Sequence, residues 1–500
     1  MQVFLSRSSG AGTKMRIAVV EPCLENKKNV IRDVIYGCWC GGKRIGGATV
    51  PPFELLTVAT ILQQEGHDVV FVDAQAEQIE IDEVKKRIAG ARLAIMSTSV
   101  MTANSDTDYL RQLKAANPQM LTAVYGSHPT FQPEATLEKG VDFAIQREPE
   151  WVIRDLARAL NNNDMVTARA VQGTVSKDDN GEVIKNKRYD YIEDLDQIPP
   201  LNVNFLPKGV DYFNPIVKNL PYITVSSSHG CPAKCSYCTA PFFHGTRTRF
   251  QSAGKVVEDI GYYLQNGMKE IYFRDETFTA DRQRVFDICA GIDKRGYKFS
   301  WICNARVDTV DFEMLTVMKK AGCHLIKFGA ESGNQDVLDA VKKGITLEQT
   351  REAFKWCNEV GIATHGHFMV GMPGETYDTM EETLDLAIEI KPTTATFGIC
   401  TPYPGTPLFR DVKRMDESID DGAKNAAMDR LHVQGSFNHL YCDVDADDLS
   451  KTVKRFYRRF YLRPSYIWLQ LTRIRNSNML RNVVIGGMNV FNFATNKNSS

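Results

Sequence analysis

Short apolar runs rich in β-branched residues alternate with helical stretches between Met15 and about Trp151. The runs occupy residues 16–22, 68–75, 92–99, 121–128 and 141–148. The intervening segments 52–66 and 77–90 place apolar residues at helical spacing. Strands that alternate with helices predict a doubly wound, Rossmann-like α/β domain, and such a domain binds ligands at the carboxyl ends of its parallel strands.

The same alternation resumes after residue 221 with a longer repeat. Its candidate strands are residues 222–228, 270–276, 299–308, 325–332, 363–373 and 394–402. Six strand–helix units predict a partial (β/α)6 barrel, in which the chemistry sits at the carboxyl ends of the strands. Polar residues and Gly-rich turns fall at those ends, as in the motif of residues 371–375.

Less regular segments separate these two patterns and close the chain. Residues 194–207 are Pro-rich and polar, which is typical of a linker. After Phe409 the strand pattern stops and helical patterns follow. The predicted parts are a disordered leader (1–14), the first domain with its linker (15–195), the barrel (215–410) and a C-terminal helical region (411–500).

Composition narrows the class of protein. The 500 residues are 43% hydrophobic and 24% charged, which excludes a disordered chain. The net charge of −1 argues against a general nucleic-acid binder. With no apolar stretch suited to a signal peptide or a membrane span, we expect a cytoplasmic protein.

Charge is unevenly distributed along the chain. Residues 451–500 contain ten Lys and Arg and no Asp or Glu, so the remainder carries about −11. This tail is also aromatic, with Phe456, Tyr457 and Trp468 among others. The favoured interpretation is a basic helix docked on the acidic body; the alternative is peripheral membrane contact through residues 451–481.

Three cysteines crowd together directly after the first barrel strand. Cys231, Cys235 and Cys238 have the spacing C-x3-C-x2-C, which lets one loop bind an iron–sulfur cluster through three thiolates. In a [4Fe–4S] cluster this leaves one iron open to an exogenous ligand. The alternative is a zinc site with His229 or His244 as the fourth ligand.

This motif, with an aromatic residue (Tyr237) before the last cysteine, resembles the signature of the radical S-adenosylmethionine (SAM) enzymes. The resemblance implies that SAM binds the open iron and is cleaved to a 5′-deoxyadenosyl radical. Asp275 and Glu276 stand where the family has a Gly-Gly-Glu-like element that binds the SAM amino group. Glu331, at the family's strand-four position, and Arg306, at the end of the third strand, complete the expected SAM-binding set.

The first domain resembles the cobalamin-binding domain that precedes many radical SAM barrels. Gly126 and His128 match a Gly-Gly-x-His-x-Thr-like loop in which Tyr125 replaces the first glycine. With Ser97 at the end of the third strand, they are the expected corrinoid contacts. Because no D-x-H-x-x-G motif is present, the resemblance implies a base-off corrinoid without a histidine ligand to cobalt.

One further pair of thiols stands apart from these motifs. Cys38 and Cys40 lie in a Gly-rich segment and could be a redox pair or metal ligands, although a plain loop is the favoured interpretation.

These resemblances imply a cobalamin-dependent radical SAM enzyme that binds a [4Fe–4S] cluster, SAM and cobalamin. The expected reaction is methyl transfer to an unactivated carbon or a phosphinate centre, through a 5′-deoxyadenosyl radical and methylcobalamin. One alternative is oxidative cyclisation or ring rearrangement of a large substrate, as in the anaerobic porphyrin cyclases. Another is a non-catalytic Fe–S or cobalamin-sensing protein.

The expected partners follow from the same resemblance. They are a small-molecule or lipid-like substrate and a reductant such as flavodoxin or ferredoxin, with no nucleic acid.

Overall fold

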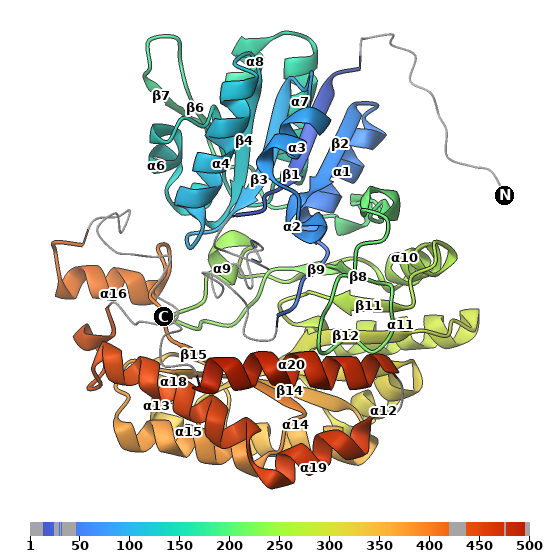
Figure 1. Cartoon of the computed structure of the whole chain (residues 1–500), viewed down its shortest axis with the longest axis vertical. Coiled ribbons are helices and arrows are strands. Elements are labelled where there is room, and N and C mark those ends of the chain that lie inside the picture. Colours follow the sequence, from blue (N-terminus) through green and yellow to red (C-terminus); the bar gives the residue numbers. More distant parts are fainter. Residues whose placement is uncertain are drawn as a thin grey trace.

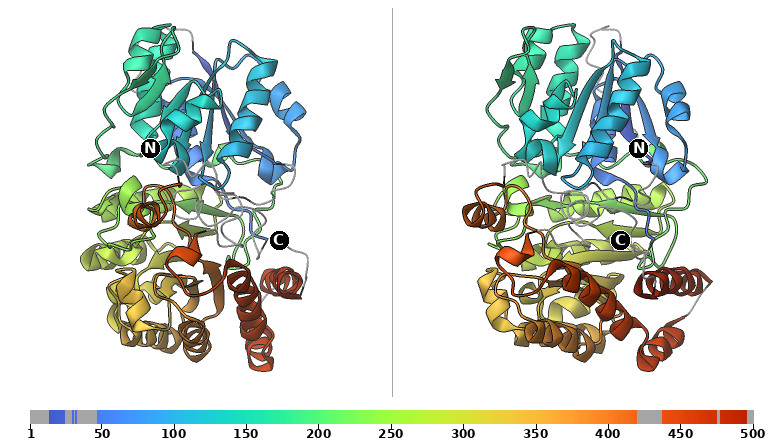
Figure 2. Two further views of the ribbon diagram at one scale, coloured as in Figure 1. Left: turned by 90° about the vertical axis from the view of Figure 1, so that its left-hand side faces the viewer. Right: turned by 60° about the vertical axis from the view of Figure 1, so that its left-hand side comes forward.

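The computed structural model describes residues 14–24, 30, 32, 47–419, 437–474 and 477–495. An N-terminal α/β domain lies over a second α/β domain, and helices from the end of the chain pack against the second (Figure 1). Figure 2 shows from two other sides that the C-terminal helices lie along one side of the second domain. Among the described residues no helix combines the length and apolarity needed to cross a membrane. Residues 1–13 and the pair Cys38 and Cys40 lie outside the described residues.

The N-terminal domain is built on one seven-stranded sheet with the order β2-β1-β3-β4-β5-β6-β7. Its strands are β1 (Arg16–Glu21), β2 (Asp68–Asp73), β3 (Leu93–Thr98), β4 (Leu121–Gly126), β5 (Phe143–Ile145), β6 (Thr174–Lys177) and β7 (Val183–Lys185). The first five are parallel, and β6 and β7 form an antiparallel hairpin at the edge. Its helices are α1 (Phe53–Gln64), α2 (Ala74–Glu77), α3 (Ile81–Arg87), α4 (Ala103–Ala116), α5 (Ser127–Phe131), α6 (Pro133–Glu138), α7 (Glu150–Asn161) and α8 (Met165–Ala170).

Alternate side chains of the central strands fill two separate cores. Ile17 and Val19 of β1 pack with α1 and α7, whereas Ala18 and Val20 pack with α3 and α4. A strand that is buried on both faces needs a nearly continuous apolar run, which is why these strands were recognisable in the sequence.

The second domain is a six-stranded parallel sheet with the order β15-β14-β13-β12-β11-β8. Its strands are β8 (Tyr222–Val225), β11 (Glu270–Phe273), β12 (Ser300–Ala305), β13 (Cys323–Glu331), β14 (Ala363–Val370) and β15 (Thr394–Ile399). The helices that cover it are α10 (Ala253–Gln265), α11 (Arg282–Arg295), α12 (Phe312–Lys320), α13 (Gln335–Ala340), α14 (Leu347–Val360) and α15 (Tyr377–Glu389). Among the described residues β8 and β15 are not paired with each other, so the barrel is open between them. The predicted α/β fold class with a partial (β/α)6 barrel is confirmed.

Short elements connect the larger ones. They are β9 (Ser228–His229), α9 (Ala240–Phe243), β10 (Arg249–Phe250) and the 3₁₀ turns Leu195–Gln197, Val203–Phe205, Phe278–Ala280, Val307–Thr309 and Asn438–Leu440.

The described C-terminal helices are α16 (Pro407–Met415), α18 (Ala446–Tyr461), α19 (Pro464–Arg473) and α20 (Ser477–Thr495). Helix α18 lies along the open edge of the barrel sheet. The Tyr461 hydroxyl accepts a hydrogen bond from the Ala395 amide (2.8 Å) and donates one to its carbonyl (2.6 Å). The Tyr457 hydroxyl accepts one from the Phe397 amide (3.3 Å). These contacts satisfy backbone groups that an edge strand would otherwise leave unpaired.

Salt bridges fix the basic side of α18 to the barrel. Arg455 and Arg459 each pair with Glu381 of α15 at 2.5 Å. The first part of the basic tail therefore docks on the acidic body of the protein.

Helix α20 reaches from α18 to the chain segment that precedes β8. The Asn482 and Asn478 side chains donate to the carbonyl oxygens of Val217 (2.8 Å) and Lys218 (3.0 Å). At its other end the ring of Phe493 packs against Tyr457 of α18 with a centroid distance of 5.1 Å. Helix α20 thus runs across the open side of the barrel (Figure 1).

Candidate functional site

The three motif cysteines lie on one loop between β9 and α9, at the carboxyl end of β8. Backbone hydrogen bonds hold this loop at both ends. The Cys231 amide donates to Gly245 (3.1 Å) and the Ser236 amide donates to Val341 (2.9 Å). Cys231 and Cys235 are buried and Cys238 is partly buried. Tyr237 is also buried, in an apolar cluster that includes Cys235.

Two cations from outside the loop lie near its thiols. Burial raises the pKa of the Cys231 and Cys238 thiols, and the charges of Arg306 and Lys343 act against that rise. Each cation also interacts electrostatically with Cys235. Such nearby positive charge favours the thiolate form of a cysteine, which is the form that binds a metal.

The positions of His229 and His244 bear on the zinc alternative. A tetrahedral zinc site holds its sulfurs about 3.8 Å apart, since each Zn–S bond is about 2.3 Å. Among the described residues, the group of potential metal ligands whose donor atoms all lie within 4.8 Å is Glu148, His229 and His244, and it contains no cysteine. In the part of the chain that the structure describes, His229 and His244 therefore do not form a tight four-ligand site with the three thiols.

The imidazoles of His229 and His244 contact carboxylates and not the cysteines. The two imidazoles stack with a centroid distance of 4.6 Å. His229 Nδ1 lies 3.0 Å from Glu148 Oε1, and His244 Nδ1 lies 2.5 Å from Glu276 Oε1. Arg249 Nη1 and Nη2 lie 3.1 and 2.5 Å from the two oxygens of Glu148, which disfavours a cation at the histidine pair.

Glu331 presents a carboxylate oxygen to the site. It lies at the end of β13, where the pairing with β14 shifts register, and its φ is +67°. Such a bulge redirects a side chain. Oε1 accepts from Lys343 Nζ at 2.8 Å. Oε2 is buried and has no hydrogen-bond partner among the described residues. An unpaired buried carboxylate oxygen fits the ammonium group of an amino-acid ligand such as SAM.

The two acidic residues after β11 have different surroundings. The fully buried Asp275 accepts from the Ser227 amide (2.6 Å) and hydroxyl (2.7 Å). Its carboxylate therefore braces the turn after β8. Glu276 contacts His244, and its negative charge contributes to raising the pKa of the Cys231 thiol. Arg306 is held by Asp308 at 2.9 and 2.8 Å.

The other three predicted contacts, Ser97, Gly126 and His128, lie together at the carboxyl edge of the N-terminal sheet. Ser97 is buried next to the end of β3, and β3 and β4 pair in register there. Gly126 has a φ of +120°, and a Cβ at this position would lie 2.0 Å from the Thr98 carbonyl oxygen. His128 is buried, and neither ring nitrogen has a hydrogen-bond partner among the described residues. Burial lowers its pKa to about 3, so the ring is neutral.

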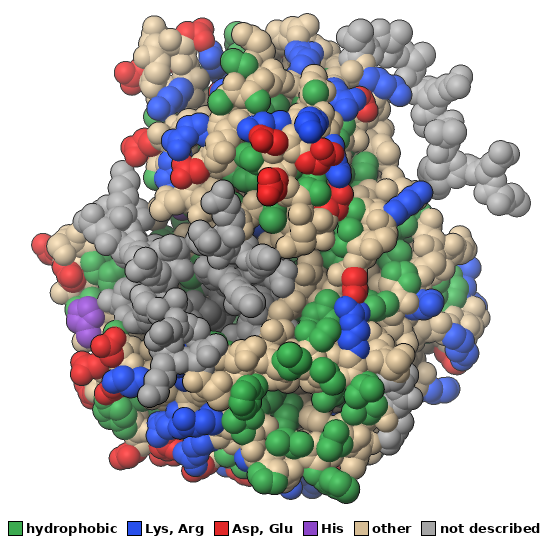
Figure 3. Space-filling view, viewed as in Figure 1, with side chains coloured by type: hydrophobic (Ala, Val, Ile, Leu, Met, Phe, Trp, Pro, Cys, Tyr) green, Lys and Arg blue, Asp and Glu red, His purple; other side chains and the backbone are tan. Residues whose placement is uncertain are grey.

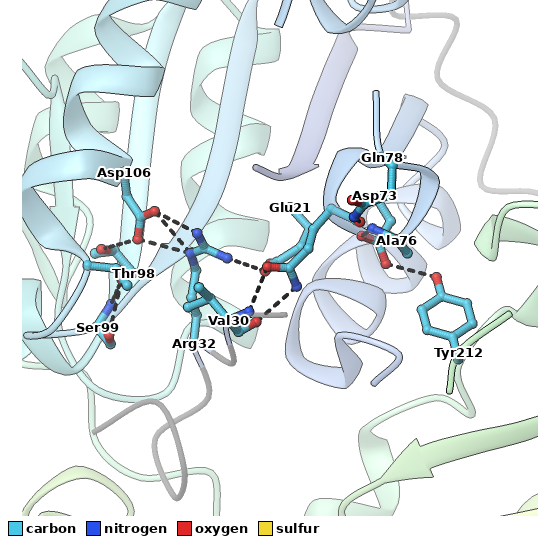
Figure 4. Close-up of polar contacts among 12 residues, drawn as sticks. Glu21, Val30, Arg32, Asp73, Ala76, Gln78, Thr98, Ser99, Asp106 and Tyr212 are labelled. Carbon is cyan, nitrogen blue, oxygen red and sulfur yellow. Dashed lines mark hydrogen bonds and ion pairs between the residues drawn. The ribbon is translucent and has the colours of Figure 1, made fainter. Parts of the chain in front are cut away.

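A buried charge network at the same edge was missed in the sequence (Figure 4). Arg32 Nη2 lies 2.8 Å from Asp106 Oδ1, and Arg32 Nη1 also pairs with Glu21 at the end of β1. Thr98 donates to Asp106 at 2.8 Å. Burial raises the pKa of Glu21 to about 8, with a smaller contribution from neighbouring carboxylates including Asp73, and Arg32 only partly opposes this. The signal in the sequence that could have indicated this network is Glu21, an acidic residue at the carboxyl end of a buried strand.

These features fit the two implied cofactors. The unpaired nitrogens of His128 and the close packing at Gly126 make the N-terminal edge a polar, tightly shaped surface suited to a corrinoid. The thiols and Glu331 suit a cluster and SAM.

Comparison with protein families supports this assignment. The model of the Radical SAM superfamily matches residues 225–387, and the model of the B12 binding domain matches residues 46–157. An uncharacterized methyltransferase of Pyrococcus horikoshii, PH0819, is 30% identical over 433 residues, which cover 85% of this chain and 91% of that protein. The anaerobic magnesium-protoporphyrin IX monomethyl ester cyclase of Rubrivivax gelatinosus is 28% identical over 443 residues, covering 87% and 77%.

Solved structures share the fold. The cobalamin-dependent SAM radical enzyme OxsB, with aqua-cobalamin and SAM bound, matches with a TM-score of 0.71 and 18% identity, over 96% of this chain and 72% of OxsB. The radical SAM methyltransferase TsrM from Kitasatospora setae, with cobalamin and a [4Fe–4S] cluster, matches with a TM-score of 0.64 and 18% identity, over 80% and 75%. The chain therefore belongs to the radical SAM superfamily, in the group with an N-terminal cobalamin-binding domain, and it is an enzyme whose cofactors are a [4Fe–4S] cluster, SAM and cobalamin.

Proposed function

We propose that this enzyme transfers a methyl group to an unactivated carbon or a phosphinate centre of a small-molecule substrate. The similarity to PH0819, a methyltransferase by name, supports this reaction. So does the cytidylyl-2-hydroxyethylphosphonate methyltransferase of Streptomyces wedmorensis, which is 25% identical over 417 residues.

The observation that carries the proposal is the contact between the two cofactor-binding edges. Glu148 follows the last parallel strand of the cobalamin-binding domain and bonds His229, two residues before Cys231. The edge that fits a corrinoid and the loop that fits the cluster therefore adjoin. A methyl donor and a radical generator must both reach one substrate carbon, which requires this placement.

When bound, the cluster supplies the electron that cleaves SAM, and cobalamin supplies the methyl group. The chain's own residues bind these groups and hold them in position. Cys231, Cys235 and Cys238 provide the thiolates, and Lys343 offsets their charge. The free oxygen of Glu331 would accept hydrogen bonds from the ammonium group of SAM and so help to hold SAM at this site.

A second reaction, oxidative cyclisation, is supported by one observation. The Rubrivivax gelatinosus cyclase aligns over 87% of this chain at nearly the same identity as PH0819. Either reaction requires a one-electron reductant, and we propose a flavodoxin or a ferredoxin for this role.

The test is anaerobic reconstitution with iron, sulfide and hydroxocobalamin, followed by SAM, a strong reductant and candidate substrates. Methyl transfer yields 5′-deoxyadenosine and S-adenosylhomocysteine in equal amounts together with a methylated product. Deoxyadenosine and a dehydrogenated, ring-closed product without S-adenosylhomocysteine would establish the cyclase reaction instead. The Cys235→Ala enzyme is the control and should form none of these products.

A further inference from the structure

Large hydrophobic side chains are exposed on the last two helices. Of the twelve large hydrophobic residues that are exposed in the described part of the chain, seven lie between residues 467 and 491. They are Ile467, Trp468 and Leu471 of α19 and Leu480, Val484, Met488 and Phe491 of α20. Monomeric soluble proteins rarely expose so many together, and such patches mark interaction sites.

The α20 residues lie on one side of their helix. Their spacing of four, four and three residues places them on a single face. Other positions of the helix are committed to the protein, because Asn482, Val490 and Ala494 are buried. Figure 3 shows hydrophobic side chains gathered over α19 and α20 on the face that both helices present to solvent. We refer to these seven residues as the α19–α20 face.

The aromatic residues of the tail divide between two roles. Tyr457, Phe460 and Tyr466 are buried against the barrel, so they stabilise the fold. Trp468, in contrast, is 70% exposed. Tryptophan is enriched at the boundary between lipid headgroups and acyl chains, where its ring is partly buried and its N–H stays hydrated.

The charge of the C-terminal tail indicates which kind of surface the α19–α20 face would bind. Residues 451–500 contain ten basic residues and no acidic one, and several of them, including Lys451 and Arg458 of α18, are exposed. An anionic lipid headgroup layer complements this charge. A second copy of the chain would instead bring like charges together, because the segment carries no acid to pair with them.

We propose that the α19–α20 face binds the surface of a bilayer that contains anionic lipids, with both helices lying in the plane of the interface. The exposed side chains enter the boundary between headgroups and acyl chains, and the basic residues of α18 contact the headgroups. Apolar burial and electrostatic attraction together give the affinity of such amphipathic segments. This inference is independent of the reaction proposed above.

The experiment measures co-sedimentation of the full-length protein with vesicles of phosphatidylcholine alone or mixed with phosphatidylglycerol. The wild type should sediment with the anionic vesicles, and added salt should weaken binding. The variant Met488→Ser/Phe491→Ser should bind more weakly by about tenfold or more, because two exposed apolar side chains no longer leave water. The matched control is Val166→Ser/Phe312→Ser, which removes two exposed hydrophobic residues elsewhere and should bind as the wild type does.

Circular dichroism should give the same melting temperature for both variants and the wild type, since all four side chains are exposed. Absence of binding to anionic vesicles at low salt would overturn the proposal. So would a concentration-dependent dimer, seen by sedimentation equilibrium, that Met488→Ser/Phe491→Ser dissociates, because the face would then be a contact between two copies. Either result leaves the radical SAM assay unaffected, so the two proposals are tested separately.

Discussion

Glu148 and Arg249 form a buried two-point ion pair across the boundary between the cobalamin-binding domain and the barrel. Burial acts to raise the pKa of Glu148, but hydrogen bonds from His229 and Arg249 outweigh it and lower that pKa. The carboxylate is therefore ionised and depends on its partners. The ion pair fixes the cobalamin-binding edge against the start of the cluster loop.

Replacing Arg249 with methionine should destabilise the protein by about 3–5 kcal/mol, because Glu148 would remain buried without its cation. Urea unfolding followed by fluorescence measures this loss. Arg247→Met is the matched control, because Arg247 pairs with Glu193 where both side chains are exposed. An exposed pair contributes roughly 0–1 kcal/mol, so equal losses in the two variants would contradict the role given to Arg249.

The Cys235→Ala variant should lose the brown colour and the bound iron of the reconstituted enzyme and retain hydroxocobalamin, since the two sites lie in different domains. Absorbance spectra and iron analysis measure both cofactors. Cys289→Ala removes a thiol that packs in the barrel core, and it should keep its iron. Retention of a full cluster by Cys235→Ala would remove this residue from the ligand set.

Glu375 should make stability depend on pH. Its side chain is fully buried after β14, and burial raises its pKa to about 8, against 4.5 for an unperturbed glutamate. Between these values the unfolded chain loses a proton that the folded protein keeps, so stability falls as pH rises from about 4.5 to 8. Its contribution to that slope is at most about 1.4 kcal/mol per pH unit.

The Glu375→Gln variant should therefore lose less thermal stability than the wild type between pH 6 and pH 8. Melting temperatures at the two pH values give the comparison. The exposed Glu359→Gln variant should keep the wild-type dependence. Identical pH profiles for wild type and Glu375→Gln would show that the Glu375 carboxyl does not titrate in this range.

The Gly126→Ala variant should be destabilised and should bind cobalamin more weakly. Its Cβ would lie 2.0 Å from a backbone oxygen, which cannot move as a flexible side chain can, and its φ of +120° adds strain of about 1–3 kcal/mol. Gly140→Ala is the control, since its φ is +86° and no atom lies within 4 Å of the added Cβ. Melting temperature and a hydroxocobalamin titration should both show a larger effect at Gly126.

Local pattern was sufficient to predict the strands and the cysteine loop. Central parallel strands need unbroken apolar runs, and cluster cysteines must be close in sequence to share one loop. The pairing of Glu148 with Arg249 could not be predicted, because the residues are 101 positions apart and meet only when the two domains dock. Arg32 and Asp106, 74 positions apart, depend in the same way on the packing of the N-terminal sheet.

The aromatic content of the tail likewise did not predict which of its side chains pack against the barrel and which face solvent. The sequence pattern favoured docking of a basic helix, and α18 shows such docking through Arg455 and Arg459. It could not separate Tyr457, which packs inward, from Trp468, which faces solvent, because that difference depends on how each helix lies on the barrel.

The hydroxyls of Tyr457 and Tyr461 have a consequence for the solubility of shortened chains. They occupy backbone positions on β15 that could otherwise pair with a strand from another molecule. A chain that ends before residue 446 would keep the cluster cysteines and the cobalamin-binding domain, yet it would expose this strand edge as a template for aggregation. Helix α18 thus protects the protein against intermolecular sheet growth, and shortened forms of this enzyme need to retain it.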